Sequence, residues 1–91
     1  MSEKLRNFEQ FEQYLTNVRD FTYRHCEAYW TDDNVYVVKD YGTVLLRQKP
    51  GRILYFDNTL YSNTTSKIQN TIKRVFGIKG VDERKVYENN N

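Results

Sequence analysis

The sequence predicts a two-layer α+β domain in which a helix, a four-stranded antiparallel meander and a second helix follow one another (αββββα). Apolar residues recur at helical spacing near both ends of residues 1–80, and runs of alternating or β-branched residues lie between them. Short turn-forming segments separate these runs. With 91 residues the chain suits one domain, which we expect over 1–80, with 81–91 as a loosely held C-terminal tail.

The first helix is predicted from Asn7 onward. Phe8, Phe11, Leu15 and Val18 follow one another at spacings of three or four residues, with glutamate and glutamine between them. Asn7 has a side chain suited to cap the free N–H groups of the first turn. The apolar stripe is therefore expected to face a sheet.

Four strands are predicted between the helices. They are FTYRHCEAYW (21–30), VYVVK (35–39), TVLLRQ (43–48) and ILYF (53–56). The segments between them contain the Asp, Asn, Gly and Pro residues that favour turns. Because short connections join antiparallel neighbours, these strands are expected to form a meander.

The second helix is predicted from the spacing of Ile68, Ile72, Val75 and Phe76, which places all four on one face. We expect each of them to be well buried. Gly77 stands where a left-handed residue commonly ends a helix.

The polar segment at the start of this helix has two interpretations. Ser62, Asn63 or Thr64 can cap the helix, which needs only local hydrogen bonds. The free N–H groups and the helix dipole can instead hold a phosphate or sulfate. The candidate anion ligands are Thr64, Thr65, Ser66 and Lys67. No glycine-rich loop precedes them, so the P-loop pattern is absent.

Positive charge is concentrated in the second half of the chain. Residues 1–46 contain five basic and eight acidic residues, whereas 47–80 contain seven basic and one acidic. Such a surface can contact nucleic-acid backbone or an acidic protein, or it can simply be solvated. The predicted partner-binding residues are Arg47, Lys49, Arg52, Lys67, Lys73 and Arg74, with Tyr36 and Tyr41 as aromatic anchors.

Catalytic and metal-binding groups are sparse. His25 and Cys26 are neighbours on a predicted strand, so their side chains are expected to point to opposite faces and not to form a nucleophile–base pair. Asp32 and Asp33 are adjacent, but turn chemistry explains them as well as a cation site does. We therefore expect no enzyme activity, no metal and no cofactor.

Two further expectations concern location and assembly. No run of residues approaches the length of a membrane span, and no signal peptide is recognised, so a cytoplasmic location without membrane contact is expected. Residues 35–38 and 43–46 are apolar on both parities, which favours a homodimer. A central strand covered on its second face by the tail explains the same pattern.

Two segments carry a resemblance, DYGTVLLR (40–47) and YSNTTSK (61–67). They resemble a strand of type Tyr-x-Thr-x-Val and a helix start of type Tyr-Ser-x-Thr-Thr-Ser-Lys in small proteins of bacteriophages and mobile elements of Gram-positive bacteria. In the first, Tyr41 and Thr43 match but Leu45 stands at the valine position. In the second, Ile68 follows the lysine where the group often has histidine, so no role of that histidine is carried over.

The resemblance implies a small accessory protein, of a class that includes anti-CRISPR inhibitors. Our leading expectation is a non-enzymatic, phage-type binding protein that occludes a host protein or protein–nucleic-acid complex, such as a CRISPR nuclease. The alternative is a DNA- or RNA-binding regulatory module that uses the basic second half directly.

Overall fold

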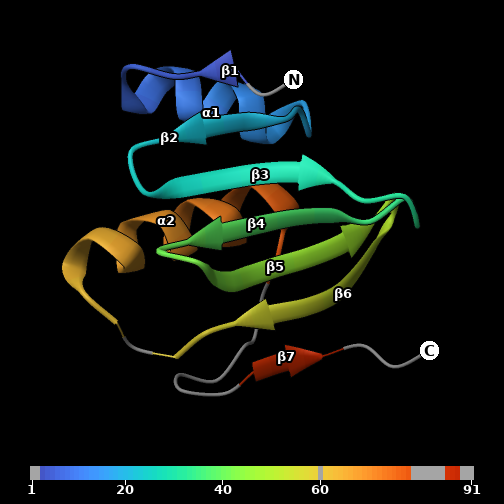
Figure 1. Cartoon of the computed structure of the whole chain (residues 1–91). Coiled ribbons are helices and arrows are strands. Elements are labelled where there is room, and N and C mark those ends of the chain that lie inside the picture. Colours follow the sequence, from blue (N-terminus) through green and yellow to red (C-terminus); the bar gives the residue numbers. More distant parts are fainter. Residues whose placement is uncertain (1–2, 60, 79–85, 89–91) are drawn as a thin grey trace.

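The computed structural model describes residues 3–59, 61–78 and 86–88 (Figure 1). Its elements, in chain order, are β1 (Glu3–Lys4), α1 (Phe8–Thr16), β2 (Phe21–Tyr23), β3 (Cys26–Trp30), β4 (Tyr36–Asp40), β5 (Thr43–Lys49), β6 (Arg52–Asp57), α2 (Asn63–Phe76) and β7 (Val86–Glu88). None of the described helices is both long and apolar enough to cross a bilayer.

The predicted αββββα arrangement is wrong. Strands β1 to β6 form one mixed sheet in which each strand lies beside its neighbour in sequence, and β7 adds to its edge along β6. β1 is parallel to β2, and the other neighbours are antiparallel. The sequence interpretation missed β1 and β7 because each has only two or three residues.

One strand is predicted over 21–30, but the chain forms two strands there, β2 and β3, joined by a turn that contains no typical turn residue. The segment predicted as one strand over 21–30 folds back at Arg24 and His25, so that Tyr23 pairs with Cys26. Arg24 has φ 56°, a value that glycine or asparagine usually supplies in a two-residue hairpin. The alternation of aromatic and polar residues over 21–30 therefore predicted one continuous strand where the chain forms a hairpin.

The parallel pairing of β1 and β2 requires a crossover, and α1 supplies it within residues 5–20. Asn7 caps the helix as expected, because its side chain accepts a hydrogen bond from the backbone N–H of Gln10 at 2.9 Å. Phe11 and Leu15 are fully buried against the sheet.

The second helix begins and ends close to the predicted residues. Ser62 is its N-cap, and Gly77 ends it with φ 66°. Ile68 and Ile72 are buried. Val75 and Phe76 are only half-buried, which corrects the expectation that all four apolar residues lie deep in the core.

A β-bulge changes the parity of β5. Val38 pairs with Leu46, but Lys39 pairs with Val44, so that Leu45 is the extra residue. Leu45 and Leu46 are both fully buried. Part of the apolar character on both parities that the sequence shows over 43–46 therefore comes from this bulge.

Both helices cover the same face of the sheet. In Figure 1, α2 lies behind the strands, and the core joins apolar residues of α1 and α2 to residues of one strand parity. No helix covers the opposite face in the described part of the chain. Of the predicted tail over 81–91, Val86–Glu88 form a strand, and the remainder lies outside the described residues.

Replacement of Ile72 by alanine tests the packing of α2. Ile72 is fully buried, so its truncation is expected to lower the free energy of unfolding by about 2–4 kcal/mol. Asn70→Ala, at an exposed position of the same helix, is the control and should cost under about 0.5 kcal/mol. Chemical denaturation measures both; equal, small losses would show that α2 does not pack as described.

Candidate functional site

The uncovered face of the sheet carries a row of four side chains on adjacent strands. Tyr29 of β3 pairs with Val37 of β4, Val37 with Arg47 of β5, and Arg47 with Tyr55 of β6. Directly paired residues share a face of the sheet, so the row places two tyrosines and one arginine around a central valine. We call these four residues the sheet row.

Cations lie against both tyrosine rings. The guanidinium carbon of Arg47 is 5.4 Å from the ring centroid of Tyr55, and Lys39 Nζ is 5.6 Å from that of Tyr29. These are cation–π distances. The contacts hold flat aromatic and guanidinium groups along a face whose centre, Val37, is only 5% exposed.

The charge of this face is positive on β3 to β6. Register and alternation place Lys39, Arg47, Lys49 and Arg52 on it. On the same strands the acidic residues of this parity are the exposed Glu27 and the buried Asp57. Asp57 accepts hydrogen bonds from the Thr59 N–H and the Tyr61 hydroxyl. The hydrogen bond to this carboxylate raises the pKa of Tyr61.

The six predicted basic contacts are divided between two layers. Arg47, Lys49 and Arg52 lie together on the uncovered face, whereas Lys67, Lys73 and Arg74 belong to α2. Two of the helix cations already have partners, because Lys67 Nζ lies 4.3 Å from the ring centroid of Phe8 and Arg74 forms an ion pair with Glu12. The predicted cluster is thus two separate groups.

Of the two predicted aromatic anchors, one is buried and the other is exposed. Tyr36 is fully buried and donates its hydroxyl to the carbonyl of Arg19 at 2.8 Å, so it is corrected from an exposed anchor to a core residue. Tyr41 is 61% exposed in the β4–β5 turn and stacks on His25. Sequence reasoning missed Tyr29 and Tyr55, because only the strand register shows that they share a face with Arg47.

The start of α2 is capped, as the simpler interpretation of the polar segment required. The Ser62 hydroxyl accepts the N–H of Thr65, and the Thr65 hydroxyl donates to Asp40 Oδ2 at 2.6 Å. Thr65 and Asp40 are both buried. Of the candidate anion ligands, Thr65 is therefore engaged with a carboxylate, while Thr64 and Lys67 line a pocket.

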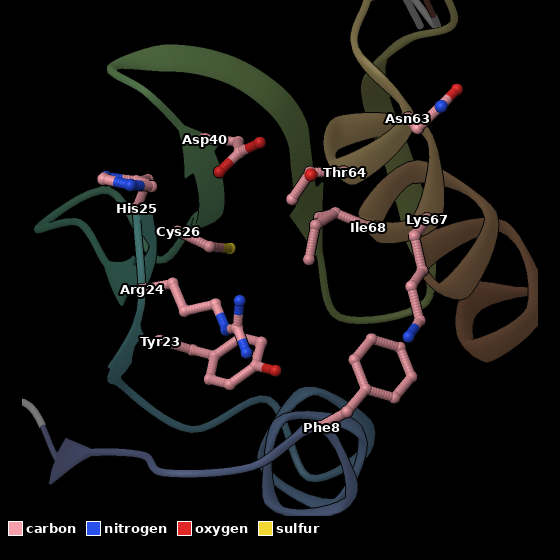
Figure 2. Close-up of a pocket in the computed structure, with 10 residues that line it drawn as sticks. All are labelled: Phe8, Tyr23, Arg24, His25, Cys26, Asp40, Asn63, Thr64, Lys67 and Ile68. Carbon is pink, nitrogen blue, oxygen red and sulfur yellow. The ribbon is translucent and has the colours of Figure 1, made fainter.

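This pocket has a volume of about 340 Å³ and lies between the β2–β3 turn and the first turns of α1 and α2 (Figure 2). Arg24 enters it from the turn, with its guanidinium carbon 5.6 Å from the ring centroid of Tyr23. Lys67 enters from α2 beside Phe8. Asp40 closes its inner end.

His25 and Cys26 lie in different surroundings. Cys26 is buried, and burial, followed by the charges of Asp40 and Glu27, raises the pKa of its thiol well above the ordinary range. The thiol is therefore protonated and a poor nucleophile. His25 is exposed and stacks on Tyr41 with ring centroids 4.2 Å apart.

Asp32 and Asp33 lie in an exposed turn before β4. Asn34 there has φ 64°, a backbone conformation that asparagine adopts readily in turns. Among the residues that the structure describes, no three His, Cys, Asp or Glu side chains are grouped to hold a metal ion.

Comparison with known proteins places the chain in no family. No protein-family model matches it, and neither curated proteins nor solved structures gave a match. The resemblance to small phage proteins gains no support from this result.

Replacement of Thr65 by valine tests the buried contact between sheet and helix. Valine keeps the shape but cannot donate to Asp40, so the free energy of unfolding should fall by about 1–3 kcal/mol. Thr64→Val, at the exposed neighbouring position, is the control and should have little effect. If thermal and chemical unfolding show the same stability for both variants, the contact does not secure α2.

Proposed function

We propose that this chain is a non-enzymatic binding protein that holds single-stranded nucleic acid on the uncovered face of its sheet. The observation that carries the proposal is the sheet row, with its two tyrosines and one arginine in register across four strands. Flat aromatic and guanidinium groups stack on bases, and cations beside them contact phosphates.

The spacing of the row suits an extended strand. Tyr29 and Tyr55 are three strand spacings apart, or about 14 Å, with Arg47 between them. Bases can stack on each of these planar groups when they are not paired in a duplex. Binding on this face therefore favours a single strand.

The remaining cations extend the positive surface along β5 and β6. Lys49 pairs with Arg52 next to the hairpin turn, and Lys39 lies on the opposite side of the row. A duplex is read by an element inserted into its groove, usually a helix or a two-stranded ribbon. A broad sheet face offers no such projection, which again favours single strands.

Occlusion of a host complex such as a CRISPR nuclease has no support from the comparisons, and we do not include it in the proposal. A protein target is instead the competing outcome of the test below. The homodimer stays a prediction. If two copies paired through their uncovered faces, Arg47 and Lys49 of each copy would face like charges, which repel. A cytoplasmic location, where nucleic acid is accessible, is part of the proposal.

A fluorescent oligothymidylate provides the test. Arg47→Gln with Lys49→Gln should weaken binding, because it removes one stacking guanidinium and one phosphate contact, and the phosphate contact of Lys49 should reduce the slope of log affinity against log salt by about 0.7. Tyr29→Leu and Tyr55→Leu should each cost about 1–3 kcal/mol of binding free energy, because leucine keeps apolar area but cannot stack. Fluorescence anisotropy measures these affinities.

Matched variants in the helix layer are the controls. Lys73→Gln with Arg74→Gln removes the same charge from α2, and Tyr14→Leu removes a tyrosine that also lies beneath a cation, Arg19. Both should bind nearly as the unmodified protein does. Equal losses in test and control variants would show only nonspecific charge attraction. No binding at low salt, with retention of the chain on an acidic protein, would replace the proposal by a protein target.

A further inference from the structure

We propose that the pocket between Arg24 and Lys67 binds a small phosphorylated polyhydroxy molecule, such as a sugar phosphate. This pocket lies on the helix side of the sheet, and the inference is independent of the nucleic acid proposed for the opposite face. Its volume of about 340 Å³ falls within the range of small-molecule sites.

Two cations reach this pocket from separate elements. Arg24 belongs to the β2–β3 turn and Lys67 to α2, and both line the pocket. Figure 2 shows Arg24 reaching into the space from the turn and Lys67 running down from α2 to the ring of Phe8. Neither has a carboxylate within ion-pair distance in the described part of the chain. Each instead rests on a ring, that of Tyr23 or Phe8, which leaves its N–H groups to face a ligand.

Arg24 has a backbone conformation in the left-handed region, which is unfavourable for residues other than glycine. Its φ of 56° is unusual for a residue with a long side chain, and its guanidinium lies over the ring of Tyr23 in the pocket lining. A guanidinium and an ammonium on opposite sides of a cavity suit a compact dianion, because both make charge-assisted hydrogen bonds to phosphate oxygens.

A phosphate ion alone does not account for the rest of the pocket. Asp40 lies at its inner end, where a carboxylate accepts hydrogen bonds but repels an anion. The Asp40 side chain is buried, and Thr65 donates to its Oδ2. A hydroxyl group carried by the ligand would donate to this carboxylate, while the phosphate stays between the two cations. This division of charge is the reason for proposing a polyhydroxy carrier.

Calorimetric titration with ribose 5-phosphate tests the inference, with inorganic phosphate and ribose as separate arms. We expect saturable binding of ribose 5-phosphate, at least about tenfold weaker binding of phosphate, and the weakest binding of ribose. Phosphate that binds as tightly as ribose 5-phosphate would overturn the assignment of a polyhydroxy carrier. No saturable binding of ribose 5-phosphate would overturn the site.

Variants identify the residues responsible. Arg24→Gln and Lys67→Gln should each weaken ribose 5-phosphate binding by about tenfold or more. Arg19→Gln is the matched control, because Arg19 also lies over a ring, that of Tyr14, but is not part of the pocket lining. The affinity of this variant for ribose 5-phosphate should not change. Asp40→Asn should reduce the difference in affinity between ribose 5-phosphate and phosphate. The substitution removes an acceptor for the sugar hydroxyl and a charge that repels phosphate.

Circular dichroism and thermal unfolding identify variants that fail to fold, and only folded variants are compared. Arg47→Gln with Lys49→Gln should bind ribose 5-phosphate normally, because both residues lie on the other face of the sheet. Unchanged affinity in both Arg24→Gln and Lys67→Gln would overturn the site, whatever the outcome for nucleic acid.

Discussion

The packing of both helices against one face of the sheet is the constraint on which the rest of this structure depends. The described helices both lie on one face, so the large apolar side chains of the core gather on the strand parity that faces them. Phe11 and Leu15 of α1 and Ile72 of α2 complete that core. The other parity carries Tyr29, Tyr55 and Arg47 around the buried Val37, and the proposed binding surface follows from that division.

The contact between Asp40 and Thr65 fixes how the second helix meets the sheet. A buried hydroxyl donates to a buried carboxylate at 2.6 Å, joining the end of β4 to the first turn of α2. The same carboxylate closes the pocket that Arg24 and Lys67 enter. Anchoring the helix and shaping the pocket therefore depend on one side chain, which explains why a negative charge lies among groups suited to bind an anion.

The sequence predicted features that depend on nearby residues and missed those that depend on pairing. Caps at Asn7 and Gly77 were recognisable because helix ends are local. The hairpin at Arg24 was not, since its residues carry no turn preference. The bulge at Leu45 and the burial of Tyr36 arise from strand register, which a single sequence does not specify. The pocket was only partly foreseen, through Lys67 and Thr64.

Side-chain nuclear magnetic resonance during titration with an oligothymidylate shows which face of the sheet meets the nucleic acid. If the uncovered face binds the strand, the ring signals of Tyr29 and Tyr55 and the Nε–H signal of Arg47 should shift together and saturate at the same oligonucleotide concentration. The signals of Phe76 and Arg74, in the helix layer, should stay unchanged. Shifts confined to the helix layer, or none on the sheet row, would contradict the claim that the uncovered face binds nucleic acid.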